Sequence, residues 1–369
     1  MVMRWHSAHI YYYDSDGLDD LILGAVRPLF DSLPRGADRA YFVRHWLRGP
    51  HVRAHVRADD ATFETEVRPL VETTIRGYLR RRPSADGSAS ERELRSHERL
   101  AELENEAGPL TPWFPDNSIQ YLPYDRRLHV LGTEEAADLL ADFHTETTPL
   151  AFEIIDSARG ASRLESVLSL MFATAHIACP PIAKGYLSYR SHAEGFFANC
   201  AEPTSMRARF EHIYETNRAT LAAHLADVIA VLDGDSDAVP RVSCWAELIR
   251  HYHKRAEQLH AAGRLPLPPI MSPREVAKSS PWTAVSEFHQ ALLANDYVRR
   301  ELEEAAWFAV YRVLLNYQYL FFSRLGVKPV DRFMLCHLAA RTVEDVYGLP
   351  VDDVITSLND PAASWAVTP

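Results

Sequence analysis

The spacing of apolar residues changes at residue 133, and this change constrains the fold more than any single motif. Before it, residues 5–14, 39–58 and 118–132 show patterns typical of strands, whereas 16–33 and 62–81 show helical spacing. After it, helical spacing recurs in segments 133–158, 162–182, 203–232, 243–262, 284–296 and 298–325. We therefore expect the α+β class: a small antiparallel sheet with packed helices in the N-terminal part, followed by a mostly helical C-terminal part.

The two parts are expected to form a single integrated domain over residues 1–369, because no convincing linker separates them. The α+β part would cover residues 1–132, and the mainly helical part residues 133–350. Residues 82–112 are polar and low in bulky apolar side chains, so we expect a mobile loop or insert there, with a short charged helix.

The composition excludes several classes of protein. A net charge of −11 and a pI near 5.9 argue against a general nucleic-acid binder, which would carry a basic footprint. The first residues lack the apolar core of a signal peptide, and no uninterrupted apolar run is long enough to span a membrane. The four cysteines are far apart in the sequence. These features favour a reduced, cytoplasmic protein.

Residues 39–58 read as a hairpin around Gly49 and Pro50. In its second strand, Arg53, His55 and Arg57 alternate with small apolar residues, which places them on one basic sheet face. This face is either solvated or a polar floor that binds the carbonyl or carboxylate oxygens of a peptide. Two arginines of a later strand, Arg126 and Arg127, would extend such a floor.

A helix near the C-terminus, "YRVLLNYQYLFFSRLG" at 311–326, is apolar yet carries many polar groups. At 100° per residue, Arg312, Asn316, Tyr319 and Ser323 form one polar stripe, while Gln318 lies roughly opposite Asn316 and Tyr317 falls between. The stripe is either the exposed side of a surface helix or the lining of a cavity. In a cavity, phenols and carboxamides would hydrogen-bond a neutral substrate and relay protons.

Other local candidates are less informative. Ser191, His192 and Glu194 form a polar cluster that, by spacing alone, is best explained as a loop or helix-cap network. His251 and His253 have the wrong spacing for a shared metal on a helix. The usual phosphate-binding, dinucleotide-binding, metalloprotease and serine-hydrolase motifs do not occur in the sequence.

Five segments occur together in a recognisable order: "WHSAHIYYYD", "AYFVRHWLRGPHVRAHVR", "YLPYDRRLHVLG", "SYRSHAEGFF" and "NYQYLFFSRLGV". With them, the chain resembles the thiopeptide-type bacteriocin biosynthesis family from Trp5 to about Gly348. It is similar to the C-terminal, glutamate-eliminating domain of lantibiotic dehydratases. Two activities in this family compete. One eliminates glutamate from glutamylated Ser or Thr; the other, the pyridine synthase activity, joins two dehydroalanines of one peptide.

Departures from the eliminating pattern favour the second activity. The hairpin keeps Arg53, but His55 replaces the second arginine of the usual "G-H-I-R-L-R". Arg126 matches the later strand, while Arg127 replaces its glutamate. The C-terminal helix supplies no histidine where eliminating domains carry a catalytic one, and Gln318 or Tyr317 stands nearest to that position. Elimination needs a base for the Cα proton and cations for the departing carboxylate.

The resemblance therefore implies a pyridine synthase of thiopeptide biosynthesis. Such an enzyme performs a formal aza-[4+2] cycloaddition on a leader-linked precursor peptide, with loss of water and expulsion of the leader. We expect Tyr319 or Tyr317 to donate or relay protons, Asn316 and Gln318 to position amides, and His192 to be a further candidate for proton transfer. The core-peptide site would be lined by Arg53, His55, Arg126 and Ser191.

No metal or redox cofactor is implied, because this chemistry is redox-neutral. The expected partner is the leader-containing precursor peptide, and the sequence leaves a homodimer open. Two alternatives remain. A glutamate-eliminating lyase would need another histidine, such as His192 or His55, to face Arg53 and Arg126. A non-catalytic peptide-binding partner would pack its tyrosines as core.

Overall fold

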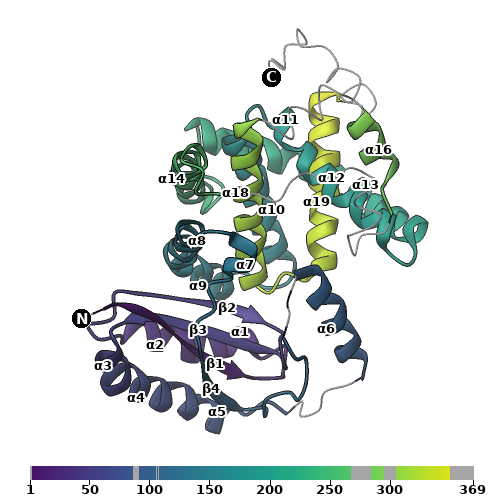
Figure 1. The fold of residues 1–369 in the computed structure, drawn as a ribbon. Helices are drawn as coiled ribbons and strands as arrows, with labels where there is room; N and C mark the ends of the chain where they lie inside the picture. The colour runs from purple at the N-terminus through teal and green to yellow at the C-terminus, as the bar shows by residue number, and fades with distance from the viewer. Residues whose placement is uncertain are drawn as a thin grey trace. The chain divides into compact units, whose positions relative to one another are not determined.

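A computed structural model describes residues 2–85, 91–104, 106, 108–266, 284–294 and 305–349 of the chain. The chain divides into two compact units (Figure 1). Unit 1 comprises residues 1–159 and 320–326, and unit 2 comprises residues 160–319 and 327–369. The single integrated domain expected from the sequence stays a prediction.

Unit 1 contains a four-stranded antiparallel sheet with the order β2-β3-β1-β4. The strands are β1 (Arg4–Tyr11), β2 (Arg39–His45), β3 (His51–Ala58) and β4 (Ser118–Leu122). The alternation predicted for the hairpin is confirmed, because Val52, Ala54 and Val56 are buried on the face opposite to Arg53 and His55.

Helices cover the apolar face of this sheet (Figure 1). One run contains α1 (Leu18–Leu21), the π-helical η1 (Ile22–Val26) and α2 (Arg27–Asp31). The other contains α3 (Asp60–Thr62), η2 (Phe63–Val67), α4 (Arg68–Val71), η3 (Glu72–Arg76) and α5 (Gly77–Arg81). Tyr121, which shares the apolar face, donates a hydrogen bond of 3.1 Å to Glu72. The opposite face of the sheet is therefore left for polar side chains.

The rest of unit 1 departs from two expectations. Only Ser118–Leu122 of the predicted strand region 118–132 is a strand, and α7 (Leu128–Leu131) follows it. The segment 133–158 forms two helices, α8 (Glu134–Glu146) and α9 (Thr148–Ser157), because Pro149 has no N–H to continue a helical ladder. Within the predicted insert at 82–112, α6 spans Glu91–Glu104, which is the charged helix expected there.

Unit 2 is helical in its described residues. Its helices are α10 (Ala161–Ala178), α11 (Ile182–Gly185), α12 (Leu187–Asn199), α13 (Pro203–Asp233), α14 (Val242–Ala261), α16 (Glu287–Ala294), α18 (Ala306–Arg324) and α19 (Pro329–Tyr347). Residues 320–324 of α18 are grouped with unit 1. The helix α12 replaces the loop or cap that spacing favoured at 186–197, and α19 was not among the predicted segments. The α+β class is confirmed.

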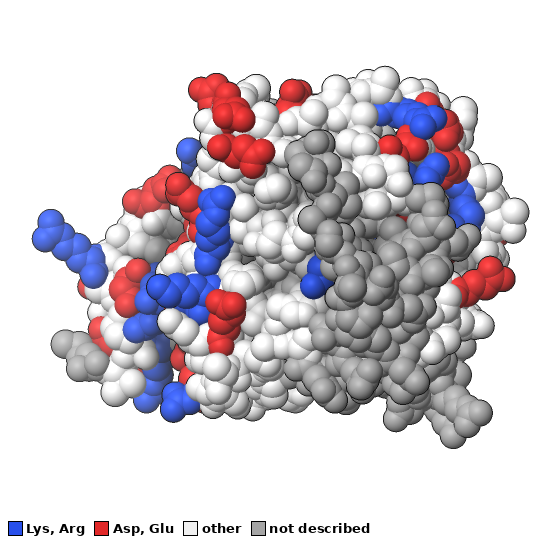
Figure 2. All heavy atoms as spheres, turned by 90° about the horizontal axis from the view of Figure 1, so that it is seen from above, with Lys and Arg blue, Asp and Glu red and all other residues white. Residues whose placement is uncertain are grey.

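Two features of the structure relate to the predictions that the chain is not a general nucleic-acid binder and has no membrane span: the surface charge and the length of its apolar helices. Acidic and basic side chains lie intermixed on the face seen in Figure 2. Among the described residues, no single helix has the length and apolar character needed to cross a membrane. The bent pair Ala161–Ala178 and Ile182–Asn199, at 107°, passes that test only when the two helices are combined.

Candidate functional site

The polar face of the unit 1 sheet carries a cluster of histidines. Register places Ser7 opposite His55 and His9 opposite Arg53. The Ser7 hydroxyl lies 2.9 Å from Nδ1 of His55 and 3.0 Å from Nε2 of His9. Burial, with a further contribution from the Arg53 charge, lowers the pKa of His9 to about 3. The predicted neighbours Arg53 and His55 are thus brought onto one face.

Arg53 is held by two neutral imidazoles. Nδ1 of His51 lies 2.8 Å from the Gly49 carbonyl and donates to it, so Nε2 is free to accept a 3.1 Å hydrogen bond from Nε of Arg53. Nη2 of Arg53 lies 3.1 Å from Nδ1 of His45. Burial, followed by the Arg53 charge, holds the pKa of both histidines well below the usual range, which keeps them neutral.

The charge of Arg53 has no carboxylate within ion-pair distance among the described residues, although burial lowers its pKa and Glu106 partly opposes this effect. A guanidinium carries five N–H groups, and only two of them are engaged by the histidines. A nearly buried cation with open donors can bind a carbonyl or carboxylate oxygen.

Arg126 does not join this arrangement. Its guanidinium pairs with Glu134 at 2.7 Å and with Asp138 at 2.5 Å, both on α8. Burial is the main cause of the lowered pKa values of His45 and Arg53, and the charge of the neighbouring Arg127 adds a smaller contribution in the same direction. Arg126 is thus held by carboxylates of α8, and its place beside Arg53 and His55 in the core-peptide site stays a prediction.

In unit 2, Tyr319 lies in a buried cluster rather than in a polar stripe. Its hydroxyl is 3.4 Å from Sγ of Cys336, and its ring meets the edge of His192 with centroids 5.0 Å apart. Asn316 and Ser323, expected on the same stripe, are exposed. Burial raises the pKa of Tyr319 well above its usual value, so the phenol stays protonated and acts as a donor.

His192 is neutral in this cluster. Nδ1 lies 2.6 Å from the Ser188 carbonyl and donates to it, which leaves Nε2 as an acceptor. Burial lowers the pKa of His192 to about 4, and the charges of Arg332 and His289 act in the same direction. The guanidinium of Arg332 lies 5.1 Å over the Tyr319 ring. The cluster thus joins residues of α12, α18 and α19.

The other predicted residues of α18 lie in different surroundings. Gln318 is fully buried, and its Oε1 accepts a 3.2 Å hydrogen bond from the Tyr189 hydroxyl. Its Nε2 has no hydrogen-bond partner among the described residues. Tyr317 is buried beside Tyr252, with ring centroids 6.4 Å apart. Of the predicted catalytic residues, the structure brings together Tyr319 and His192.

Ser191 has a partner that sequence reasoning missed. Its hydroxyl lies 2.8 Å from Nε2 of His289, and Nδ1 of His289 lies 2.7 Å from the Ser286 hydroxyl. His289 is on α16, far from Ser191 in the sequence. No local signal identifies such a pair, because its two residues meet only through the packing of α16 on α12.

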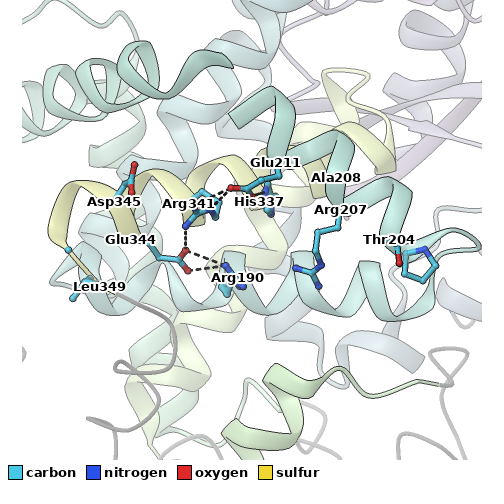
Figure 3. A pocket seen from close by; sticks show the side chains of 12 residues that line it. Arg190, Thr204, Arg207, Ala208, Glu211, His337, Arg341, Glu344, Asp345 and Leu349 are labelled. Carbon is cyan, nitrogen blue, oxygen red and sulfur yellow. Dashed lines mark hydrogen bonds and ion pairs between the residues drawn. The ribbon is translucent and has the colours of Figure 1, made fainter. Parts of the chain in front are cut away.

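Glu194, predicted beside Ser191 and His192, belongs to another network. It receives two hydrogen bonds from Arg207, at 2.8 and 2.6 Å, and pairs with Arg190 at 2.9 Å. Arg190 also pairs with Glu344 at 3.2 Å (Figure 3). We call these four ion-paired side chains, Arg207, Glu194, Arg190 and Glu344, the ladder. The carboxylates of Glu194 and Glu344 are its most buried members.

Three members of this ladder, Arg190, Arg207 and Glu344, line a pocket of about 880 Å³ between α12, α13 and α19 (Figure 3). On its α19 wall, Arg341 binds Glu211 and Glu344 at 3.1 and 3.2 Å, and Nε2 of His337 lies 2.9 Å from Glu211. The volume is typical of a ligand site. Within the described ranges, no group of three or more His, Cys, Asp or Glu residues is arranged to hold a metal ion.

Comparisons with known proteins identify solved structures and a family that the chain resembles. Solved structures that the chain resembles include the pyridine synthase TbtD from thiomuracin biosynthesis, with 33% identity, a TM-score of 0.75, and 94% of this chain matched to 100% of that one. TsrL is 22% identical with a TM-score of 0.73, covering 98% and 100% of the two chains, and shares the fold.

The tRNA-dependent lantibiotic dehydratase MibB from Microbispora sp. 107891 also shares the fold. It is 14% identical, with a TM-score of 0.50, and 92% of this chain matches 28% of that longer one. No curated protein matches the chain. The family model described as lantibiotic biosynthesis dehydratase C-term matches residues 5–343. The chain therefore belongs to the lantibiotic biosynthesis dehydratase C-terminal family.

Proposed function

We propose that this protein is a pyridine synthase of thiopeptide biosynthesis. It joins two dehydroalanines of a modified, leader-linked precursor peptide by a formal aza-[4+2] cycloaddition. Loss of water and expulsion of the leader then leave a macrocycle around a pyridine. The observation that carries this proposal is the likeness to the pyridine synthase TbtD, at 33% identity over 94% of the chain.

The chemistry requires one amide to adopt its imidic-acid tautomer and two alkenes to be held in register. Orientation in well-held intramolecular cases supplies ~7–11 kcal/mol of the barrier. Loss of water and expulsion of the leader each then remove one proton from the ring and add one to the leaving group. Tyr319 is the proposed donor of the proton that the leaving group takes up. Burial raises its pKa, so the phenol is protonated at neutral pH but is a weak acid, and it gives up its proton only as negative charge develops on the leaving group.

Arg53 is proposed to bind a carbonyl oxygen of the core peptide in unit 1. Its open N–H groups have the charge and directionality for this contact, and His45 and His51 hold the guanidinium plane. His55 would line the same surface through Ser7. Arg126, whose charge is matched by Glu134 and Asp138, is less suited to bind substrate.

The partner is proposed to be the leader-containing precursor, with the protein in the cytoplasm. We assign the leader to the pocket lined by the ladder of α12, α13 and α19. Its arginines and carboxylates provide donors and acceptors side by side, a pattern that suits the backbone and polar side chains of a peptide. A mixed-charge wall also limits the binding of simple anions.

A glutamate-eliminating lyase is the second candidate. The charge of Arg53, which has no carboxylate at ion-pair distance within the described part of the chain, would also suit a leaving carboxylate. One experiment separates the two. The protein is incubated with a leader-linked, azole-containing peptide that bears two dehydroalanines, and separately with a glutamylated peptide, and mass spectrometry follows both.

Free leader amide together with a macrocycle supports the pyridine synthase. Loss of glutamate from the second peptide supports the lyase and overturns the first proposal. Binding of both peptides with no change in mass would leave a non-catalytic partner.

A further inference from the structure

His289 lies at the centre of a hydrogen-bond chain that the proposed function has not yet used. The chain runs from the Ser191 hydroxyl to Nε2 of His289, at 2.8 Å, and from Nδ1 to the Ser286 hydroxyl, at 2.7 Å. Both imidazole nitrogens therefore face uncharged hydroxyl groups, which can each donate or accept. Either tautomer of the ring fits this setting. The ring can therefore take up a proton at one nitrogen as it releases another from the second nitrogen, and it stays neutral.

The attachment of α16 to α12 does not depend on His289 alone. At the C-terminal end of α12, the carboxamide of Asn199 donates to the Ala284 carbonyl at 2.9 Å and accepts from the Ala284 N–H at 3.0 Å. This paired contact fixes the start of the α16 region. A purely structural role for His289 would duplicate an anchor that is already present.

The hydrogen-bond chain lies beside the Tyr319 cluster. Ser191 and His192 are consecutive on α12, and the His192 ring lies 5.0 Å from that of Tyr319. Ser191 is partly exposed, so its hydroxyl can be reached from outside the protein core.

We propose that Ser191 contacts the reacting amide and that His289 is its proton-relay partner in the tautomerisation that precedes cycloaddition. This inference rests on the proposed function. The amide N–H proton passes to Oγ of Ser191 as the Ser191 hydroxyl proton passes to Nε2 of His289. The Nδ1 proton passes to Ser286, whose own proton leaves to water, and water protonates the carbonyl oxygen. The amide becomes its imidic acid, and the protein gains and loses one proton.

The groups around His289 are consistent with a neutral relay. Burial lowers the pKa of His289, and the charge of Glu194 on α12 opposes this effect. Glu194 is already paired with Arg190 and Arg207, so it does not hold a proton on the imidazole. His192, next to Ser191 on α12, has a pKa lowered mainly by burial and is neutral as well.

The test compares His289→Ala and Ser191→Ala with the wild type on the bis-dehydroalanine substrate, with and without free imidazole. A relay predicts a loss of kcat of about 100-fold in both variants, with KM changed less than about twofold. Added imidazole should restore kcat in H289A but not in S191A, because only the first variant leaves a space of the right shape beside an intact hydroxyl. Asn199→Ala is the control for loosened packing and should change kcat only a few-fold.

Each outcome decides one question. A wild-type protein that leaves the substrate unchanged refutes the proposed function and, with it, the relay. An active wild type with an unaffected H289A variant refutes the relay alone. A loss in H289A that imidazole does not reverse, with a raised KM matched by Asn199→Ala, assigns His289 a structural role and overturns the proposal.

Discussion

Acid should unfold unit 1 earlier than an average domain, because its sheet buries several neutral histidines. The set comprises His9, His45, His51, His55 and His144. Burial is the largest cause of the lowered pKa in every case. In the unfolded chain these rings titrate near the ordinary value of 6.5. The folded and unfolded states therefore bind the same number of protons at these rings well above pH 6.5. As the pH falls below 6.5 only the unfolded chain binds protons there, so the free energy of unfolding decreases.

The magnitude follows from this difference. At pH 5.5, keeping one such ring neutral in the folded state costs ~1.4 kcal/mol relative to an unfolded chain in which it binds a proton. For the whole set the cost is ~7 kcal/mol, as long as the folded-state pKa values stay below the working pH. Since domains are stable by only about 5–15 kcal/mol, this loss is a large fraction of the total.

Hydrogen exchange of peptides from β1 and β3, corrected for intrinsic rates, measures the effect within unit 1. We expect the free energy of opening to fall by several kcal/mol between pH 7.5 and 5.5. His144→Phe is a matched variant, because the His144 ring stacks on Tyr41 with centroids 5.1 Å apart and Phe keeps that stacking. Its pH dependence should be smaller by ~1.4 kcal/mol. Equal protection at both pH values would refute the reasoning.

Three further changes test other parts of the structure. Tyr319→Phe removes the proposed proton donor and should lower kcat about 100-fold at unchanged KM in the mass-spectrometric assay; wild-type turnover would exclude the phenol. Arg324→Ala removes three hydrogen bonds to α8, α9 and the residue between them, of 3.0, 2.8 and 2.6 Å. It should lower the free energy of unfolding of unit 1, measured in urea, by ~3 kcal/mol. The control Arg27→Ala, at an exposed ion pair, should lower it by less than ~1 kcal/mol. Arg207→Gln should weaken binding of the isolated leader about tenfold by fluorescence anisotropy, and unchanged affinity would place the leader elsewhere.

The basic sheet face was predictable because strand alternation is a local property. Val52 and Arg53 point to opposite faces whatever the rest of the chain does. Alternation within one strand could not predict which side chains surround Arg53, because His9 and His45 come from other strands. The ion pairs of Arg126 had a visible signal in the sequence. Glu134 and Asp138 follow within the next twelve residues, in or near the acidic first turn of α8.

Helical periodicity failed where polar residues are buried. It assumes that polar side chains face water, yet Glu194 is only 5% exposed and is paired with two arginines. The segment 187–199 therefore lacked the expected contrast between faces, and α12 was read as a loop. The same assumption grouped Tyr319 with Asn316 and Ser323 in one polar stripe, although Tyr319 is buried with its hydroxyl 3.4 Å from Sγ of Cys336 and the other two are exposed.

The neutrality of the Tyr319 cluster yields a last prediction, about the pH dependence of turnover. The pKa of His192 is lowered to about 4 and that of the Cys336 thiol is raised to about 11, in both cases mainly by burial. Tyr319 keeps its proton for the same reason. None of these groups changes charge between pH 6.5 and 9, so kcat should be flat across that range, above the acid limit set by unit 1. A reaction that used a histidine base with an ordinary pKa, near 6.5, would instead give a kcat that rises through neutrality. A sloping profile between pH 6.5 and 8 would therefore contradict the cluster as the site of a charge-neutral cycloaddition.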